Sequence, residues 1–417
     1  MNVKKKAIYL ATRSPVPCTG GREKMIQQTI RFLQNEYDLI FVYIERKNHN
    51  SSIKIKNKFN IYKVIRLNYP SFSEILFNIF RPRFCFQEAL FYSFKNHKII
   101  KDIISKNNPY VLIVDMIRMK NYVTSNFNGL KIIEIDDLLS LRYLRFANHL
   151  TKELNIFATF TGILPNIVEK TINRFFLKYI LMREAKIIKN KEIECTSKFD
   201  AVILVSKNES EQLQQLSGSK NIFNIPPCVF TIRKKNKFSL NNLLFMGNLT
   251  TNQNLSSFFY IINNILPLLR KEKITFEFRV VGIYDDRSLI IAKKYNDIKL
   301  LGFVDSIEDI TDQCRLMLAP ITFGTGIKLK ILDALSLGLP VVTNSVGAEG
   351  LAGEAGKHYL VGNNAQVLVQ QILLLCRSQE KCKELSKNAF ELMKEKYHES
   401  VVQKQYMHIL HHQCSRH

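Results

Sequence analysis

The sequence predicts an α/β protein made of two doubly wound parallel-sheet domains. Its 417 residues exceed what one ordinary hydrophobic core accommodates, so two domains are expected. Short, nearly continuous apolar runs alternate with amphipathic helical patterns, which is typical of parallel strands buried on both faces. The alternation pauses at a polar, basic stretch, residues 231–242, and then restarts. We interpret this stretch as the linker between the domains.

The first domain is predicted to span residues 1–235. Amphipathic patterns between its apolar runs predict helices at 22–36 and 94–107. The apolar runs themselves predict strands at 7–11, 39–44, 111–115, 131–136 and 201–206.

The second domain is predicted to span residues 236–392. A long helical pattern, 393–417, ends the chain, and we expect it to pack back on the first domain. Helices are expected at 254–270 and 326–337. Strands are expected at 243–247, 276–282, 299–303, 316–320 and 340–344.

The composition bears on the cellular compartment of the protein and on the partners that it can bind. Sixty Lys and Arg residues against 36 Asp and Glu give a net charge of +24, which suits an anionic membrane surface, nucleic acid or phosphate-bearing substrates. An AT-rich genome, which favours lysine codons, explains the same bias without any partner. The eight cysteines are scattered without a CxxC pair, which favours free thiols in a reducing compartment. No nucleic-acid module is recognisable, so we expect no nucleic-acid partner.

No membrane-crossing or export segment is predicted. The start, "MNVKKKAIYLA", has too few apolar residues for a signal peptide, and no uninterrupted apolar run reaches ~18 residues. We expect a cytoplasmic protein, with the inner face of the membrane as a peripheral location. Two stretches, 79–94 and 156–186, interleave aromatic residues with Lys and Arg. They suit either a membrane interface or ordinary helix packing.

One segment combines several features of an anion site. "FGTGIKLKILDALSLGLPVV", residues 323–342, follows a predicted strand, opens a helix and leads into another apolar run. Gly324 and Gly326 let a ligand approach the backbone, and Lys328 adds a full positive charge. The first amides of a helix at the carboxyl edge of a parallel sheet favour phosphate. A tight glycine turn beside a solvated lysine is the alternative interpretation.

This segment resembles the donor-site signature of GT-B glycosyltransferases of the family 4 type. The resemblance extends to "NNLLFMGNLTTNQN", "LLGFVDSIEDI" and "NSVGAEGL", which are similar to the opening donor loop, the segment facing the base and the loop over the sugar. It implies two Rossmann-like domains facing an interdomain cleft that holds a nucleotide sugar. The implied donor-binding residues are Gly247, Asn248, Gly302, Val304, Gly324, Gly326, Ile327, Asp333 and Gly347.

The first domain resembles the same family less specifically. "PVPCTGGREKMI" is similar to the glycine-bearing loop near the acceptor, which implies acceptor-side roles for Gly20 and Gly21. "VDMIRMKNY" and "IDDLLSLRY" are similar to enzymes that build surface polysaccharides. Arg118 is implied on the acceptor side, where it could hold a phosphate or equally pair with local acids. Asp137 is a candidate base toward an acceptor hydroxyl, and its alternative role is to cap a helix.

The implied activity is a retaining hexosyltransferase that acts in cell-surface polysaccharide biosynthesis. It would move a sugar from a nucleotide sugar to a glycan, expected to be lipid-linked. No metal and no cofactor are expected, and no DxD motif occurs in the sequence. The departing diphosphate would then be stabilised by the helix dipole and by basic groups. The catalytic candidates are Asp137, Lys328 and Thr325.

Several positions depart from the family pattern. The family usually carries two glutamates eight residues apart, where this chain has Thr325 and Asp333. An Arg and a Lys are also usual where this chain has Asn248 and Asn254, which makes Lys328 the main expected cation at the diphosphate. A nucleotide-sugar epimerase of the same fold and a catalytically degenerate binding subunit therefore stay open as alternatives.

Overall fold

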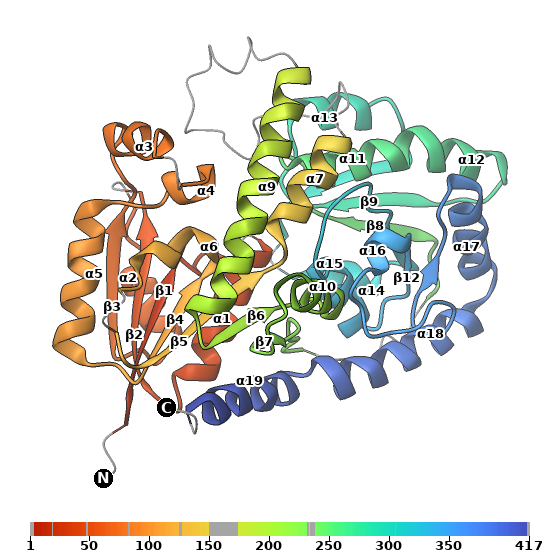
Figure 1. The fold of residues 1–417 in the computed structure, drawn as a ribbon. Helices are drawn as coiled ribbons and strands as arrows, with labels where there is room; N and C mark the ends of the chain where they lie inside the picture. Colours follow the sequence, from red (N-terminus) through yellow and green to blue (C-terminus); the bar gives the residue numbers. More distant parts are fainter. Residues whose placement is uncertain are drawn as a thin grey trace. The chain divides into compact units, whose positions relative to one another are not determined.

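The protein divides into two compact units in this computed structural model (Figure 1). The first comprises Met1–Leu141, Arg183–Pro227 and Val402–His417, and the second Arg142–Met182 and Cys228–Val401. The linker predicted at 231–242 and the stretch 156–186 lie partly outside the described residues. The structure describes residues 4–18, 20–46, 49–81, 84–124, 127–149, 174–231, 233, 238–304 and 306–414.

A parallel sheet forms the centre of the first unit. Across the described residues it has seven strands, in the order β3-β2-β1-β4-β5-β6-β7. All five predicted strands are confirmed, whereas β3 and β7, at the two edges, were not predicted. The strands are β1 (Lys6–Ala11), β2 (Asp38–Glu45), β3 (Lys63–Asn68), β4 (Val111–Asp115), β5 (Leu130–Asp136), β6 (Ala201–Leu204) and β7 (Ile222–Asn224).

Helices connect these strands, as doubly wound folds require. The predicted helix at 94–107 is confirmed as α5, and the one at 22–36 is confirmed as α1 with slightly different ends. The helices that lie wholly or partly in this unit are α1 (Gly21–Leu33), α2 (Ser52–Lys58), α3 (Phe72–Ile79), α4 (Phe86–Ala89), α5 (Phe94–Asn107), α6 (Met116–Met119), η1 (Lys120–Tyr122), α7 (Leu139–Asn148), α9 (Arg174–Lys198), α10 (Lys207–Ser217) and α19 (Glu399–Cys414).

The second unit repeats the architecture. Its sheet has six parallel strands among the residues described, in the order β10-β9-β8-β11-β12-β13. The five predicted strands are confirmed, and the two-residue β13 was not predicted. The strands are β8 (Asn242–Met246), β9 (Glu277–Val281), β10 (Ile298–Gly302), β11 (Leu316–Ala319), β12 (Val341–Thr343) and β13 (Leu360–Val361).

One helix start differs from the sequence prediction. The helix expected over 326–337 is α15 (Leu329–Ser336), which begins at Leu329 because the backbone at Lys328 is still extended (φ −85°, ψ 95°). The glycine loop is therefore longer than expected. The other helices of this unit are α11 (Asn252–Tyr260), the π-helical turn η2 (Ile261–Ile265), α12 (Leu266–Lys271), α13 (Asp286–Ala292), α14 (Ile307–Asp312), α16 (Ser345–Ala348), α17 (Ala365–Arg377), α18 (Gln379–Leu392) and the π-helical turn η3 (Met393–Tyr397).

Both sheets are covered on their two faces, as their apolar strands predict. All five residues of β4 are buried, and so are all five of β8. On one side of the second sheet, Leu243 and Phe245 pack with α11 and α17; on the other, Leu244 packs with α15. Burial on both faces explains why the sequences of these strands are continuously apolar and do not alternate between apolar and polar residues.

A buried carboxyl group lies beneath the turn that follows β5. Glu192 of α9 accepts hydrogen bonds from the backbone N–H of Ser140, at 3.0 Å, and from its hydroxyl. Burial raises the pKa of Glu192 from an ordinary 4.5 to about 7; the Ser140 hydrogen bonds oppose this rise, and the charge of Asp137 adds to it. Asp137 therefore lies close enough to Glu192 to affect its ionisation.

We expect the replacement Glu192→Gln to remove one component of the pH dependence of stability. The folded state binds this proton more tightly than the unfolded chain does. The contribution is therefore complete below pH 4.5 and is lost as pH rises to about 7. The loss amounts to at most about 3 kcal/mol. Urea unfolding at several pH values measures it, with the exposed Glu211→Gln as a control. Equal pH profiles for wild type and Glu192→Gln would contradict the assignment.

Candidate functional site

The second sheet reverses its strand order between β8 and β11, which is where open α/β folds bind ligands. The loop after β8 leads into α11, and the loop after β11 leads into α15. The loop after β11 contacts the start of α11. The Thr322 hydroxyl donates a hydrogen bond to the Ser256 hydroxyl at 2.8 Å, and the Gln253 amide lies against Gly324. The predicted donor loop therefore lies at the switch point of this sheet.

Two glycines are required by the shape of this loop. Gly324 has φ +142° and Gly326 has φ +67°, both in the region that disfavours side chains. A Cβ atom on Gly324 would also lie 2.3 Å from Nε2 of Gln253. The backbone here is bare because both its conformation and its neighbours exclude a side chain.

Lys328 stabilises the loop itself. Its ammonium donates to the carbonyl oxygens of Thr325, at 3.0 Å, and Gly326, at 2.6 Å. The side chain is buried, and the residue is the N-cap of α15. We predicted that Lys328 contacts a diphosphate; that contact stays a prediction. The structure adds a second role, since the lysine ties the extended turn together.

Lys330, on α15, reaches across to α11. Its Nζ donates to Oδ1 of Asn254 at 2.5 Å and lies 4.9 Å from the centre of the Phe245 ring. Asn254 in turn donates to the backbone carbonyl of Asn248 at 3.0 Å. Burial and the nearby charge of Lys328 lower the pKa of Lys330 to about 7. Lys330 thus contacts Asn254, the position at which the resembled family usually has a lysine.

Two arginines of α7 also contact the glycine loop. From Arg142 onward this helix belongs to the second unit. Nε of Arg142 lies 3.4 Å from the Thr325 hydroxyl, and Arg145 donates to the carbonyl of Gly324 at 2.5 Å. Arg145 also forms a two-point ion pair with Glu349. Where the family usually has a glutamate, this chain has a threonine beside a guanidinium.

The other predicted donor-side residues lie on the same edge of the sheet or next to it. Asn344 joins two of its loops, since it bonds both Ile321 backbone groups and accepts from the N–H of Gly347 at 3.0 Å. Gly347 has no room for a side chain, because a Cβ would lie 2.0 Å from the Thr343 hydroxyl. Four residues are half-buried: Gly247 after β8, Val304 after β10, Ile327 in the loop and Asp333 on α15; Gly302, also half-buried, ends β10 with φ +70°.

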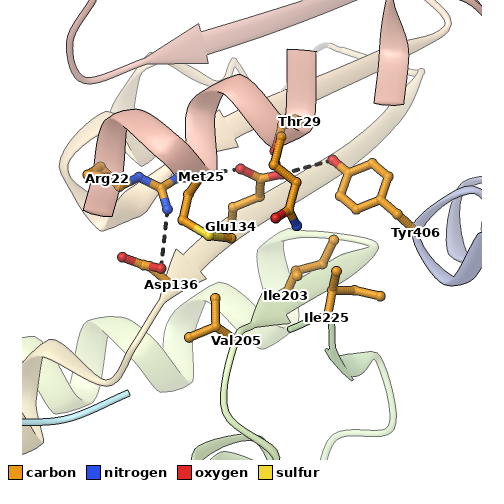
Figure 2. Close-up of a pocket in the computed structure, with 10 residues that line it drawn as sticks. Arg22, Met25, Thr29, Glu134, Asp136, Ile203, Val205, Ile225 and Tyr406 are labelled. Carbon is orange, nitrogen blue, oxygen red and sulfur yellow. Dashed lines mark hydrogen bonds and ion pairs between the residues drawn. The ribbon is translucent and has the colours of Figure 1, made fainter. Parts of the chain in front are cut away.

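The first unit has a different kind of site, a small pocket between α1 and the strands β5 to β7 (Figure 2). It measures about 10 Å³, the room of about one water molecule. Arg22 lies at its wall and forms ion pairs with Asp115, with Glu134 at 3.4 Å and with Asp136 at 3.3 Å. The pocket is lined by Arg22, Met25, Gln28, Thr29, Glu134, Asp136, Ile203, Val205, Ile225 and Tyr406.

Glu134 and Arg22 form the buried centre of this pocket. Glu134 accepts hydrogen bonds from Tyr9 at 3.0 Å, Thr29 at 2.7 Å and Tyr406 at 2.9 Å. Burial raises the pKa of Glu134, while Arg22 and the Thr29 hydroxyl oppose the rise. Burial alone would lower the pKa of Arg22, but the Asp115 and Asp136 carboxylates outweigh it and raise that pKa well above its ordinary value.

The backbone turns sharply where β4 and β5 end. Met116, directly after β4, has φ +64°, and Asp136, the last residue of β5, has φ +76°. Such conformations cost about 1–3 kcal/mol in non-glycine residues and gather at functional sites. The Asp136 side chain lines the pocket and faces Arg22 (Figure 2). It is 19% exposed, whereas Asp137 is 2% exposed. Of the two neighbouring acids, Asp136 is the one that a ligand can reach.

The predicted acceptor-side glycines lie at the start of α1, which carries Arg22. Gly20 is the N-cap of this helix, in extended conformation, and Gly21 is its first residue; both are exposed. Arg118 lies on α6, with its guanidinium 5.2 Å from the centre of the Phe91 ring. The sequence analysis did not single out Arg22, although it follows directly after the two glycines. Its contacts to three carboxylates at the ends of β4 and β5 could not be predicted from that position.

Two further observations concern the described residues. Within them, no group of three or more His, Cys, Asp and Glu side chains is arranged to hold a metal ion. No helix in the described part of the chain has the length and apolar content to span a bilayer.

The chain was compared with known proteins. Residues 241–378 match the family described as "Glycosyl transferases group 1". A curated relative, the "Uncharacterized 44.6 kDa protein in cps region" of Klebsiella pneumoniae, is 26% identical over 244 residues, which is 54% of this chain. The match spans 60% of the length of that relative.

Solved structures share the fold along nearly the whole chain. A sucrose-phosphate synthase from Thermosynechococcus elongatus is similar with a TM-score of 0.73 and 13% identity, covering 99% of this chain and 100% of that one. Anabaena HepE, solved with UDP and glucose, has a TM-score of 0.64 and 13% identity, covering 97% and 99%. The chain therefore shares the GT-B fold of these structures, and residues 241–378, in its second unit, match the family described as "Glycosyl transferases group 1".

Proposed function

We propose that this protein is a retaining glycosyltransferase that moves a sugar from a nucleotide sugar to a glycan acceptor in surface-polysaccharide synthesis. The proposal rests on the groups that meet at the switch point of the second sheet. There, bare backbone at Gly324 and Gly326, the first turn of α15 and the ammonium of Lys330 gather on one edge. Backbone amides, a helix N-terminus and a cation are the groups that bind a diphosphate.

The cations near this loop offset the two family positions that are asparagine here. Lys330 contacts Asn254 directly, and Arg142 and Arg145 contact the loop from α7. A leaving nucleoside diphosphate carries increasing negative charge as the bond to the sugar breaks. Groups fixed around it beforehand stabilise that charge without reorganisation. We assign this task to the helix terminus and Lys330, with Lys328 holding the loop in shape, and we expect neither a metal nor a cofactor.

The donor is proposed to be a nucleoside-diphosphate hexose. HepE was solved with UDP and glucose, which makes UDP-sugars the first candidates to test. Thr325 stands where the family usually has a glutamate, which would bind sugar hydroxyls, and Arg142 contacts Thr325. Asp333 can still accept hydrogen bonds from the hydroxyls of a ribose.

The acceptor side is proposed to lie at the carboxyl edge of the first sheet. Asp136 is held by Arg22 and turned toward the pocket by its unusual backbone, so its carboxylate can accept a hydrogen bond from a sugar hydroxyl. Gly20, Gly21 and Arg118 remain our acceptor-side candidates. We propose a lipid-linked glycan as acceptor, since the first unit resembles enzymes that build surface polysaccharides and the curated relative is from a cps region.

A direct test combines donor binding and turnover. Thermal unfolding is followed with UDP- and GDP-sugars; a donor at about 100 times its dissociation constant adds about 2.7 kcal/mol of stability. Nucleotide release is then measured with and without glycan acceptors. The proposal requires release that depends on the acceptor. Interconversion of donors without acceptor would identify an epimerase, and donor binding without turnover under any condition would identify a binding subunit.

Donor affinity should depend on pH through Lys330. Because its pKa is about 7 in the free protein, the ammonium is present below that pH and is lost above it. A bound diphosphate favours the charged form, so affinity should fall as pH rises through about 7, by roughly tenfold for each pH unit by which binding raises the pKa. Lys330→Arg should remove the pH dependence, and Lys330→Ala should weaken binding at low pH. Calorimetry measures both, with Lys383→Ala as the control. A donor affinity in Lys330→Ala equal to that of wild type would contradict the site.

Asp136→Asn should reduce turnover by about a hundredfold or more while leaving donor affinity unchanged. The amide keeps the shape of the side chain and removes its charge. Asp137→Asn is the matched comparison, because it alters the neighbouring acid, which is buried. Initial rates of nucleotide release, with thermal unfolding as a check on folding, distinguish the two. Loss of turnover in Asp137→Asn alone would return the catalytic role to Asp137.

A further inference from the structure

The short helix α3 of the first unit has its apolar side outward. Phe72, Leu76, Ile79 and Phe80 recur at the spacing of one helical stripe, and that stripe is exposed. The exposed fraction is 66% for Phe72, 59% for Phe77 and 77% for Phe80. A soluble helix normally buries such a stripe, so this arrangement points to a partner that is apolar at its surface.

Polar contacts hold α3 in this orientation. Asn78 is the buried residue of the helix, and its amide donates to the carbonyls of Ala89, at 3.3 Å, and Tyr92, at 2.8 Å. At the other end Ser71 and Glu74 form a capping box, and Glu74 accepts from the hydroxyl of Ser93 at 2.8 Å. The polar side chain that a helix would usually expose is therefore buried, with its Nδ2 group hydrogen-bonded to two carbonyls. The outward apolar stripe follows from this anchoring.

Basic residues extend the patch. Phe94, at the start of α5, is exposed and its ring lies 6.2 Å from that of Phe77. The guanidinium of Arg81 lies 5.3 Å from the Phe94 ring. Lys95, Lys98 and Lys101 follow at three-residue spacing on α5, and all three are exposed. Aromatic side chains thus stand next to a row of lysines.

We propose that α3 and the start of α5 form a docking surface for an anionic lipid bilayer. Aromatic and aliphatic side chains insert at the level of the headgroups, and adjacent lysines attract the negative surface. A protein partner would need its own apolar, acidic face, whereas a bilayer offers both properties at once. For the stretch 79–94, which suited either a membrane interface or helix packing, the burial of Leu90, Phe91 and Tyr92 favours packing at those residues. The outward residues lie mainly at 72–80 and at Phe94.

The position of this surface connects it to the acceptor side. α3 follows β3 at the carboxyl edge of the first sheet, and Asp136, the last residue of β5, lies at the same edge because the strands are parallel. A lipid-linked acceptor enters from a bilayer at the headgroup level. Docking through α3 would therefore bring this edge of the unit to the membrane surface. The docking itself requires no glycosyl transfer and is tested without it.

Vesicle co-sedimentation tests the proposal. Wild-type protein should bind vesicles of phosphatidylcholine mixed with phosphatidylglycerol, and bind less to phosphatidylcholine alone. Phe77→Ser with Phe80→Ser should weaken binding by about tenfold or more, given the apolar area removed. Lys95→Glu with Lys98→Glu should weaken binding to the anionic vesicles and reduce its sensitivity to salt. All four side chains are exposed, so folding should be preserved, which circular dichroism checks.

Matched controls use equally exposed residues elsewhere. Ile53→Ser with Ile290→Ser, and Lys293→Glu with Lys294→Glu, should bind like wild type. Absence of wild-type binding to either vesicle would overturn the proposal, and so would equal losses in the controls. A dimer in solution that dissociates on Phe77→Ser with Phe80→Ser would also overturn it, because a second copy would then be the occupant. Because the assay contains no nucleotide sugar, its failure would leave the transfer proposal untouched.

Discussion

The first unit depends on one buried guanidinium. Arg22 is drawn from the first turn of α1 into contact with carboxylates at the ends of β4 and β5, namely Asp115, Glu134 and Asp136. Three carboxylates this close would repel strongly in a low-dielectric interior, and removing the partner of a buried charge costs about 3–5 kcal/mol. The ion pairs raise the pKa of Arg22 although burial opposes this. Arg22 thus fixes both the strand ends and the acid that faces the pocket.

The second unit uses the same sheet edge with the opposite charge. Its switch point is lined by Lys328 and Lys330 and by backbone amides, and Arg145, which donates to the Gly324 carbonyl, also pairs with Glu349. The two units thus share a topology and differ in what their strand ends present. One edge offers a carboxylate suited to a hydroxyl group, and the other offers cations suited to a diphosphate. The proposed function rests on this difference and not on the shared topology.

The sequence predicted the strands that are buried on both faces, because a short, continuous apolar run between helical patterns is typical of such a strand. It missed β3, whose residues are mostly half-buried, and β7 and β13, which have three and two residues. It could not predict which of Asp136 and Asp137 is the more exposed, since the register between β5 and β6 shifts between Glu134 and Asp136 and the backbone then turns to a positive φ. It also placed the start of α15 three residues too early, because the apolar pattern continues into the loop, where the backbone at Lys328 is still extended.

The orientation of α3 illustrates what periodicity alone cannot decide. An apolar stripe in a sequence predicts a face that avoids water, and in most helices that face is the core. Here the buried side is set by Asn78, whose amide satisfies two carbonyls at the end of the next helix. Leaving Phe72, Phe77 and Phe80 exposed forgoes about 1.5–3 kcal/mol each compared with burial. Docking on an anionic bilayer would recover this free energy, because the stripe would then be buried in an apolar layer. The neighbouring lysines would face the negatively charged headgroups, on the sheet edge that bears Asp136.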